Sequence, residues 1–347
     1  MYWGTKVSGR QPVPRLPTGR ASTGCQAWSR TLNSLREVLD VTDQTIRYRD
    51  GEGYDHDLYD WSPLTKRTPL SWPDKSRIAV SPHVYFEYME LDPPADAVAD
   101  PRFAGALGSY FPDFQNYSRR EFGNRVGIFR VLDIFERHGI PVTVCANAMA
   151  AERYPYIVER CLRAGHAFVA HGWSWNRMNS SSMSMDEERD YIAGCIESLK
   201  KGLGQMPAGW AGQSYGESER TLQLLADAGF DYVLDWPNDD EPYFMRTQPS
   251  LVSVPNQSEW DDAQLFAVRR VDSWRYPEII GSAFEQLAQE GGRMLGLGIH
   301  PWIFGQAHRI RYLEEAVEHI ARQSGVWFAR TDEIASVYRS QRTAPDA

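Results

Sequence analysis

The stretch "FGNRVGIFRVLDIFERHGIPVTVCAN", residues 122–147, joins a helix pattern to a strand pattern. The apolar residues Ile128, Val131, Leu132 and Phe135 recur at the spacing of one helix face. The run "PVTVCAN" that follows is typical of a strand. A helix leading into a strand is half of the unit from which parallel sheets are built.

The same alternation extends outward from this stretch in both directions. Strand patterns separated by helix patterns predict a parallel sheet with right-handed crossovers. No glycine-rich phosphate loop is present, so a closed or distorted barrel is favoured over a dinucleotide-binding fold. We predict strands at 77–86, 141–147, 166–170, 208–212, 230–236, 251–255, 293–300 and 325–330, and helices at 122–139, 154–165, 188–204, 218–229, 278–292 and 309–323.

Composition excludes several classes of protein. The net charge of −9 and pI near 5.5 argue against a nucleic-acid partner. No apolar run approaches the roughly 20 residues needed to span a bilayer, so no membrane partner is expected. The four cysteines form no C-x-x-C pair, which favours reduced thiols and a cytoplasmic location. They are Cys25, Cys145, Cys161 and Cys195.

The N-terminal part differs from the rest. Residues 1–36 contain arginine and lysine but no acid, and they are rich in Pro, Gly, Ser and Thr. We expect residues 1–50 to be a flexible extension, in preference to a targeting segment, and residues 51–340 to form a single catalytic barrel domain.

Polar residues follow most of the predicted strands. In a parallel barrel the carboxyl ends of the strands meet at one face, where catalytic groups gather. A polar residue after so many strands predicts a shared site at that face. In strand order the candidates are Glu87, His171, Gln213, then Asp235, Asp239 and Asp240, then Glu259, Asp261 and Asp262, and finally His300.

Some of these residues have simpler explanations. His83 shares a face with Glu87 but lies a layer deeper, so we expect it to be buried and structural. Asp239 and Asp240 could also cap a turn. Arg125 falls in the first turn of a predicted helix, where a cation is unfavourable unless an anion pairs with it. That conflict makes Arg125 a candidate for the site.

The chain resembles the polysaccharide deacetylase superfamily, and within it the branch of metal-independent allantoinases and cyclic-imide hydrolases. The resemblance covers about residues 56–335, and it implies a distorted (β/α)7-type barrel and a homo-oligomer. It is carried by "YDWSPLTKRTPLSWPDKSRIAV", "FGNRVGIFRVLDIFERHGIP", "AHGWSWN", "DYVLDWPNDDEPY", "LVSVPNQSEWDD" and "GIHPWIFGQAHRI".

The metal-binding motifs of the sugar deacetylases are altered here. Their Thr-Phe-Asp-Asp motif is replaced by "HVYFEYM", which leaves Glu87 as the carboxylate. Their second motif keeps His171 but has Trp175 at the position of the second histidine ligand. Catalytic zinc usually takes three protein ligands, and the pair falls one short unless His300 or Asn176 joins. We therefore expect no obligatory cofactor; a bound zinc would be held by Glu87, His171 and His300.

The resemblance implies a hydrolase that cleaves a C–N bond in a small amide, imide or ureide. Glu87 would act as general base, with a pKa raised by burial, while Arg125, His171 and His300 would polarise the carbonyl and stabilise the oxyanion. The expected partner is a small-molecule substrate. Its predicted binding residues are Trp173, Trp175, Gln213, Asp239, Asp240, Glu259, Asp262 and Trp302.

The substrate is less defined than the reaction. Allantoinases of this branch carry an arginine in the region where "GWAGQS" places Gln213. The aromatic segment 105–122 is predicted to form a lid and suggests a less polar substrate than allantoin. Two alternatives remain open: a metal-dependent deacetylase of N-acetylated saccharides, or a non-catalytic ligand-binding relic.

Overall fold

A single sheet organises the unit Thr45–Ala347, of which the computed structural model describes residues 54–102 and 111–344. Its strand order is β6-β7-β5-β4-β3-β2-β1-β8, and β9 pairs with the start of β1. All pairings are parallel except that of β6 with β7. The strands are β1 Ile78–Phe86, β2 Thr143–Ala146, β3 Ala167–Ala170, β4 Gly209–Trp210, β5 Tyr232–Val233, β6 Tyr243–Phe244, β7 Val252–Ser253, β8 Arg293–Ile299 and β9 Val326–Phe328. The predicted strands are all present, and β6 is the addition.

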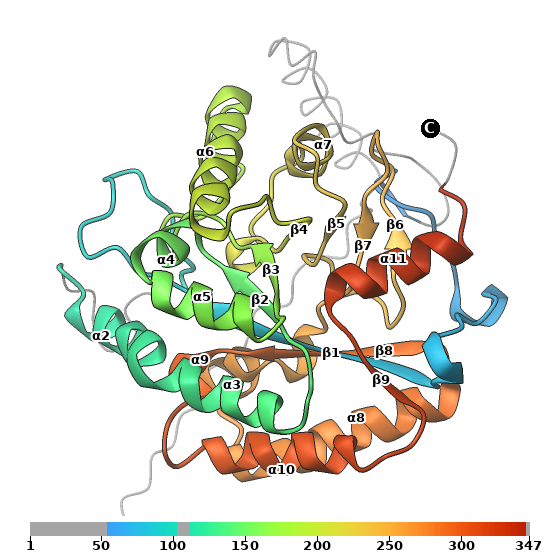
Figure 1. Cartoon of the computed structure of the whole chain (residues 1–347). Coiled ribbons are helices and arrows are strands. Elements are labelled where there is room, and N and C mark those ends of the chain that lie inside the picture. The colour runs from blue at the N-terminus through green and yellow to red at the C-terminus, as the bar shows by residue number, and fades with distance from the viewer. Residues whose placement is uncertain (1–53, 103–110, 345–347) are drawn as a thin grey trace, which may run out of the picture. The chain divides into compact units, whose positions relative to one another are not determined.

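Most helices follow the strands and cover the outer face of the curled sheet, whereas the last helix packs on the apolar cluster inside it. Figure 1 shows α3, α8 and α10 packed together along β1 and β8. The helices are α2 Phe114–Phe122, α3 Ile128–Arg137, α4 Ala148–Arg153, α5 Pro155–Arg163, α6 Met185–Leu203, α7 Thr221–Asp227, α8 Tyr276–Glu290, α9 Pro301–Phe304, α10 Ile310–Ala321 and α11 Thr331–Gln341. The predicted (β/α)7-type barrel, distorted and incompletely closed, is confirmed.

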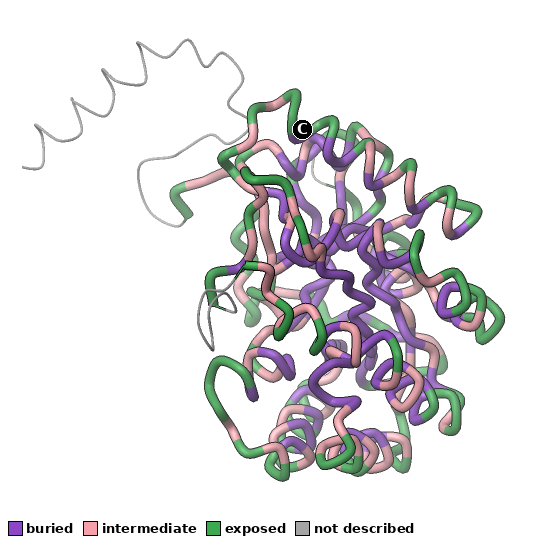
Figure 2. Tube along the Cα trace, turned by 90° about the vertical axis from the view of Figure 1, so that its left-hand side faces the viewer, coloured by how far each residue is buried: buried purple, intermediate pink, exposed green. Residues whose placement is uncertain are grey.

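β1 separates the two parts of the core. Every residue of β1 is buried, and alternate side chains point to opposite faces. Val84 and Phe86 belong to the larger apolar cluster beneath the helices, whereas Tyr85 belongs to the cluster inside the curled sheet. His83 and Glu87 share the parity of Tyr85. The strand thus directs these three polar side chains into the interior, where the buried residues gather in Figure 2.

The sheet does not close between its edge strands β6 and β8, and side chains complete the edge of β8. Gly296 N on β8 donates to Gln257 Oε1 at 2.6 Å, and Gln257 Nε2 donates to Met294 O at 2.9 Å. Trp260 Nε1 donates to Gly296 O at 2.7 Å. The free edge of β8 is therefore satisfied by an amide and an indole instead of a strand.

Replacing Gln257 with leucine should test this edge. The substitution leaves the buried groups of Gly296 and Met294 without these partners, and we expect the free energy of unfolding to fall by roughly 2–4 kcal/mol. Urea denaturation measures the change. The matched control is Gln286→Leu, because Gln286 is exposed and donates to Glu290 on the same helix. Equal stabilities of the two variants would contradict this account.

The predicted helix 122–139 is interrupted by a π-helical turn, Gly123–Gly127, between α2 and α3. This turn crosses α9 with the two backbones in contact. A Cβ at Gly127 would lie 2.1 Å from Pro301 O, and one at Gly305 would lie 2.2 Å from Gly127 Cα. Glycine is therefore required at both positions. Asn124 in the same turn donates from Nδ2 to Glu87 O at 2.7 Å, which ties the turn to the end of β1.

Three of the four cysteines lie among the described residues. Cys145, Cys161 and Cys195 are free and buried. No helix among the described residues combines the length and apolarity needed to cross a membrane. The predicted extension 1–50, Cys25 and the first part of the predicted lid, 105–110, lie outside the described residues.

Candidate active site

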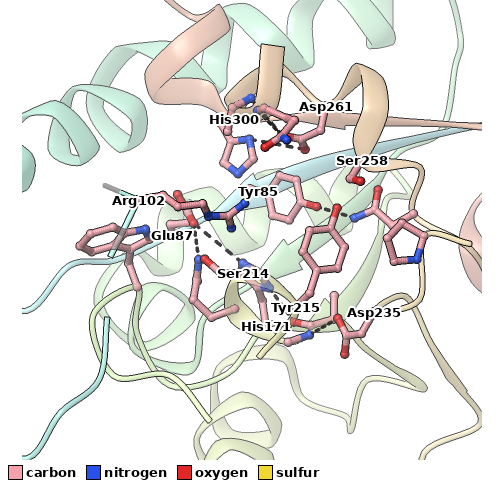
Figure 3. A pocket seen from close by; sticks show the side chains of 18 of the residues that line it. Tyr85, Glu87, Arg102, His171, Ser214, Tyr215, Asp235, Ser258, Asp261 and His300 are labelled. Atoms are coloured by element: carbon pink, nitrogen blue, oxygen red, sulfur yellow. Dashed lines mark hydrogen bonds and ion pairs between the residues drawn. The ribbon is translucent and has the colours of Figure 1, made fainter. Parts of the chain in front are cut away.

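A cavity of about 290 Å³ opens at the carboxyl ends of the strands. Figure 3 shows side chains from distant parts of the sequence pointing into it. β1 contributes Tyr85 and the following Glu87, β3 is followed by His171, and β8 is followed by His300. The remaining lining residues are Arg102, Arg120, Trp175, Ala211, Gly212, Gln213, Ser214, Tyr215, Asp235, Pro237, Asn256, Ser258, Asp261, Ala263, Gln264 and Trp302.

The carboxylate of Glu87 is 3% exposed and is surrounded by donors. Gln213 Nε2 donates to Oε1 at 2.9 Å, and Trp302 Nε1 donates to Oε2 at 3.1 Å. His171 Nε2 lies 3.8 Å from Oε1, and Arg120 Nε lies 4.0 Å from Oε2. Both carboxylate oxygens are thus held in fixed directions.

These neighbours reverse the expected pKa shift of Glu87. Burial alone would raise the pKa, but His171, His300 and Arg120 hold the pKa of this carboxyl well below its usual range. The prediction of a raised pKa was therefore wrong, because it considered burial without the cations around the carboxylate. Glu87 is ionised at any physiological pH.

His171 faces the same part of the cavity with one ring nitrogen fixed. Its Nδ1 lies 2.6 Å from Ala211 O, and because a carbonyl only accepts, Nδ1 carries a proton. Nε2 is buried and has no hydrogen-bond partner among the described residues. Asn147 Nδ2 donates to His171 O and Asn147 Oδ1 accepts from Tyr88 N at 2.9 Å. The amide of Asn147 thereby holds the ends of β1 and β3 together.

His300 forms a dyad with Asp262. Its Nδ1 donates to Asp262 Oδ1 at 2.6 Å, and its backbone N donates to Asp262 Oδ2 at 2.8 Å. The ring stacks on Tyr85 with centroids 4.1 Å apart and planes at 13°. Asp261 Oδ2 lies 3.9 Å from Nδ1. Because both contacts use Nδ1, Nε2 remains directed into the cavity.

The dyad keeps His300 protonated. Burial would lower the pKa of the imidazole, but the carboxylates of Asp262 and Asp261 and the charge of Glu87 outweigh it and raise the pKa to about 9. The site therefore holds an ionised carboxylate and an imidazolium at neutral pH.

A strained turn positions Gln213 after β4. Ser214 and Tyr215 have left-handed φ values of 54° and 60°. Gly212 N donates to Asp235 Oδ1 at 2.6 Å, which holds the start of this turn against the end of β5. Non-glycine residues in this conformation are uncommon and concentrate at functional sites.

Arginine enters the cavity from α2. The Arg120 side chain is 2% exposed, and its Cζ lies 3.5 Å from the centroid of the Trp175 ring. The predicted arginine, Arg125, is exposed instead and does not line the cavity. The helix begins at Phe114 and not near residue 122, so Arg125 lies beyond the helical turn that faces the site. The prediction of Arg125 as a site residue was therefore wrong, and Arg120 enters the cavity instead.

Four further predicted residues lie away from the cavity. Asp239 pairs with Arg67 at 2.6 Å, next to a separate pocket. Asp240 lies at the edge of β8, where Met294 N donates to its backbone O at 2.9 Å. The Glu259 side chain is 68% exposed and pairs with Arg269. Trp173 packs against Gly194 of α6. Turn formation and surface pairing account for the acidic side chains, and packing against the core accounts for Trp173.

The structure does bring most of the other candidates together. Glu87, His171, His300, Trp175, Gln213 and Trp302 all line the cavity, and Asp262 supports His300 from behind. His83 is buried, as expected, and its Nδ1 lies 3.2 Å from Asn256 Oδ1. Burial lowers the pKa of His83 to about 4. Tyr85 and Arg120 were missed, although the parity of β1 could have revealed Tyr85.

The residues present do not fit a catalytic zinc. Glu87 and His171 supply two ligands, but the guanidinium of Arg120 lies beside them against Trp175. A divalent cation there would meet a buried positive charge. His300, the third ligand considered, has its Nδ1 committed to Asp262.

A second set, Asp261, Asp262 and His300, places potential ligand atoms within 4.8 Å of one another. Asp262 already accepts from two nitrogens of His300, and Asp261 Oδ1 accepts from Ala263 N at 2.9 Å and Gln264 N at 3.2 Å. These contacts account for the cluster as support for an imidazolium.

Restoring the missing histidine tests this conclusion. We expect a Trp175→His variant, stripped with chelator, to take up no stoichiometric zinc, because Arg120 keeps a positive charge beside the new ligand. Competition with a chromophoric chelator measures uptake. Tight binding of one zinc per chain would contradict the assignment of this space to the arginine.

The fold and the acid–base cluster together describe a hydrolase-type barrel, and comparison with known proteins shows what the chain is similar to. Residues 123–233 match the family model described as polysaccharide deacetylase. A putative polysaccharide deacetylase of Schizosaccharomyces pombe is 27% identical over 304 residues, covering 78% of this chain and 92% of that protein. The peptidoglycan deacetylase of Helicobacter pylori is 27% identical over 270 residues, covering 67% and 91%.

Solved structures agree. A probable polysaccharide deacetylase from Pseudomonas aeruginosa matches with a TM-score of 0.71 and 27% identity, covering 80% of this chain and 95% of that one. The Puue allantoinase matches with a TM-score of 0.72 and 26% identity, covering 84% and 99%. Together the comparisons show that the chain is similar to proteins of the polysaccharide deacetylase superfamily. They indicate a hydrolase that acts on carbon–nitrogen bonds other than peptide bonds.

Proposed function

We propose that this protein hydrolyses a C–N bond of a small cyclic imide or ureide, or a related amide, and needs no metal ion to do so. The observation that carries the proposal is the pair of opposite charges around one cavity: an ionised Glu87 next to His171, and an imidazolium at His300. Such a pair supplies a proton acceptor and a proton donor without a Lewis acid.

The chemistry begins with a water molecule between Glu87 and His171. Glu87 is ionised, and His171 Nε2, 3.8 Å from Glu87 Oε1, has no hydrogen-bond partner among the described residues, so a water molecule beside them can contact both side chains. Water attacks the carbonyl carbon as its proton passes to this pair. The C–N bond then breaks while His300 Nε2 gives its proton to the leaving nitrogen. One water is consumed, and the products are a carboxyl group and an amine or amide nitrogen.

Size and polarity favour a small ring as substrate. The cavity volume of about 290 Å³ is at the lower limit for small-molecule sites. Asp235, Asn256 and Asp261 offer acceptors for N–H groups opposite the cationic side chains. Alternating N–H and C=O groups are typical of imides and ureides. Similarity to the Puue allantoinase supports this class. Gln213 in place of the arginine expected for allantoin favours other members.

The test is proton release during hydrolysis in excess chelator, over allantoin, hydantoin, succinimide and an N-acetyl-chitooligosaccharide. Turnover of a cyclic imide or ureide in chelator is the expected result. Silence in chelator with turnover of the saccharide restored by zinc would overturn the proposal in favour of a metal-dependent deacetylase. Binding of a ring compound without turnover, with or without zinc, would identify a ligand-binding relic.

A further inference from the structure

Arg120 is an unusual residue to find buried in the cavity, because two of its three guanidinium nitrogens have no hydrogen-bond partner among the described residues. Nη1 donates to Asn116 O at 3.5 Å, whereas Nε and Nη2 are buried without a hydrogen-bond partner among the residues that the structure describes. Leaving a buried charged donor unpaired is costly. A free Nε–Nη2 edge inside a cavity therefore points to an acceptor on a ligand.

The position of this edge is fixed on both sides. Cζ of Arg120 lies 3.5 Å from the Trp175 ring centroid and 4.9 Å from that of Trp302. Nε lies 4.0 Å from Glu87 Oε2, too far for a hydrogen bond to the carboxylate. The two indoles hold the guanidinium by cation–π contact, which leaves its donors for a ligand oxygen next to the proposed water.

We propose that the Nε–Nη2 edge of Arg120 is a subsite for the two oxygens that share one carbon in the tetrahedral intermediate, and afterwards in the product carboxylate. The proposal rests on the proposed function. Two parallel N–H groups match two oxygens on one carbon, as in arginine–carboxylate pairs. The ground-state carbonyl offers one oxygen, so the second bond forms only when water attacks. Arg120 thereby performs the electrophilic part that a metal ion performs in metal-dependent hydrolases.

This assignment predicts an effect on kcat with little change in KM. Both N–H groups of the Nε–Nη2 edge are paired only after water has attacked the carbonyl carbon. Arg120→Ala should lower kcat by about 10²–10³-fold, measured in chelator with whichever panel substrate the wild type hydrolyses. Guanidinium ion, at concentrations that do not denature the protein, should restore part of the rate with saturation. Methylammonium, a cation that lacks two parallel N–H donors, should not restore the rate. Arg125→Ala, an exposed arginine one turn further on, should have the wild-type rate.

A binding measurement separates this proposal from the proposed function. Succinamate, the ring-opened product of succinimide, should bind the wild type at least tenfold more tightly than Arg120→Ala in calorimetry. Arg120→Lys keeps the positive charge beside Glu87 and so controls for an effect of the alanine variant on folding. It should show the same loss of kcat and of succinamate binding. A wild-type kcat in either variant, a loss confined to KM, or undiminished succinamate binding would overturn the subsite. Absence of turnover by the wild type would instead count against the proposed function.

Discussion

Replacing Glu87 with glutamine is expected to lower kcat by about 10³-fold or more while a ring substrate still binds. The amide keeps the size of the side chain but removes the negative charge and the proton acceptor. The neighbouring His171 then lacks the carboxylate that lies 3.8 Å from its Nε2. Initial rates in chelator, with binding measured separately by calorimetry, test the expectation.

The same variant should lose stability. Arg120 and Glu87 are both buried, with side chains 2% and 3% exposed, and the substitution leaves the guanidinium without its counter-charge. Removing one member of a buried pair costs roughly 3–5 kcal/mol, so circular dichroism must establish that the assayed protein is folded. Glu259→Gln is the matched control, because its exposed pair with Arg269 should contribute about 0–1 kcal/mol and nothing to turnover. Near-wild-type activity of Glu87→Gln would refute the mechanism.

The second large effect concerns pH. With His300 as the proton donor, activity should fall as pH rises through about 9, the raised pKa of this imidazole. Asp262→Asn removes the nearest carboxylate, so the pKa of His300 should fall toward its usual value of about 6.5. The alkaline limb of the kcat profile should therefore move down by roughly one to two pH units, and activity at pH 8 should fall by about two- to tenfold.

Other charges face His300 and remain in that variant. Asp261 lies 3.9 Å from Nδ1 and Glu87 acts across the cavity, so the limb should stay above the value for an isolated histidine. The free energy of unfolding should change with pH in the same direction as the activity. A folded pKa above the unfolded one contributes stability that is complete below about pH 6.5 and is lost as pH rises through about 9. Asp239→Asn, outside the cavity, should leave the limb in place. If the alkaline limb of the kcat profile is unchanged in Asp262→Asn, the limb reports the titration of a group other than His300.

Sequence reasoning located the strands and the residues that follow them, because period and position fix these features. Glu87, His171 and His300 come directly after buried strands, and a strand's direction determines where its last residue points. Asp239 and Glu259 also follow strands but lie in loops, whose course depends on contacts that a local pattern does not encode. The side chain of Asp239 points to Arg67, and that of Glu259 points to Arg269, with which each forms an ion pair.

The errors about charge arose from distant neighbours. The pKa of Glu87 depends on Arg120, His171 and His300, which are brought to it by other elements. The reversed shift could not be read from the residues around Glu87 in the chain. Arg120 was missed for a related reason, since a helix boundary wrong by eight residues changes which side chains face inward.

The π-helical turn at Gly123–Gly127 has a consequence for how this site can change. Because successive residues of an α-helix are separated by about 100°, an extra residue in a π turn resets the angular phase of α2 relative to α3. Deleting one residue of the turn would rotate the face of α2 that carries Arg120 away from the cavity while α3 kept its packing. The rotation of α2 about its own axis, which the π turn sets, therefore determines that Arg120 faces the cavity. A change in chain length of a single residue, with no substitution in the cavity, is enough to exchange the side chain presented to the substrate.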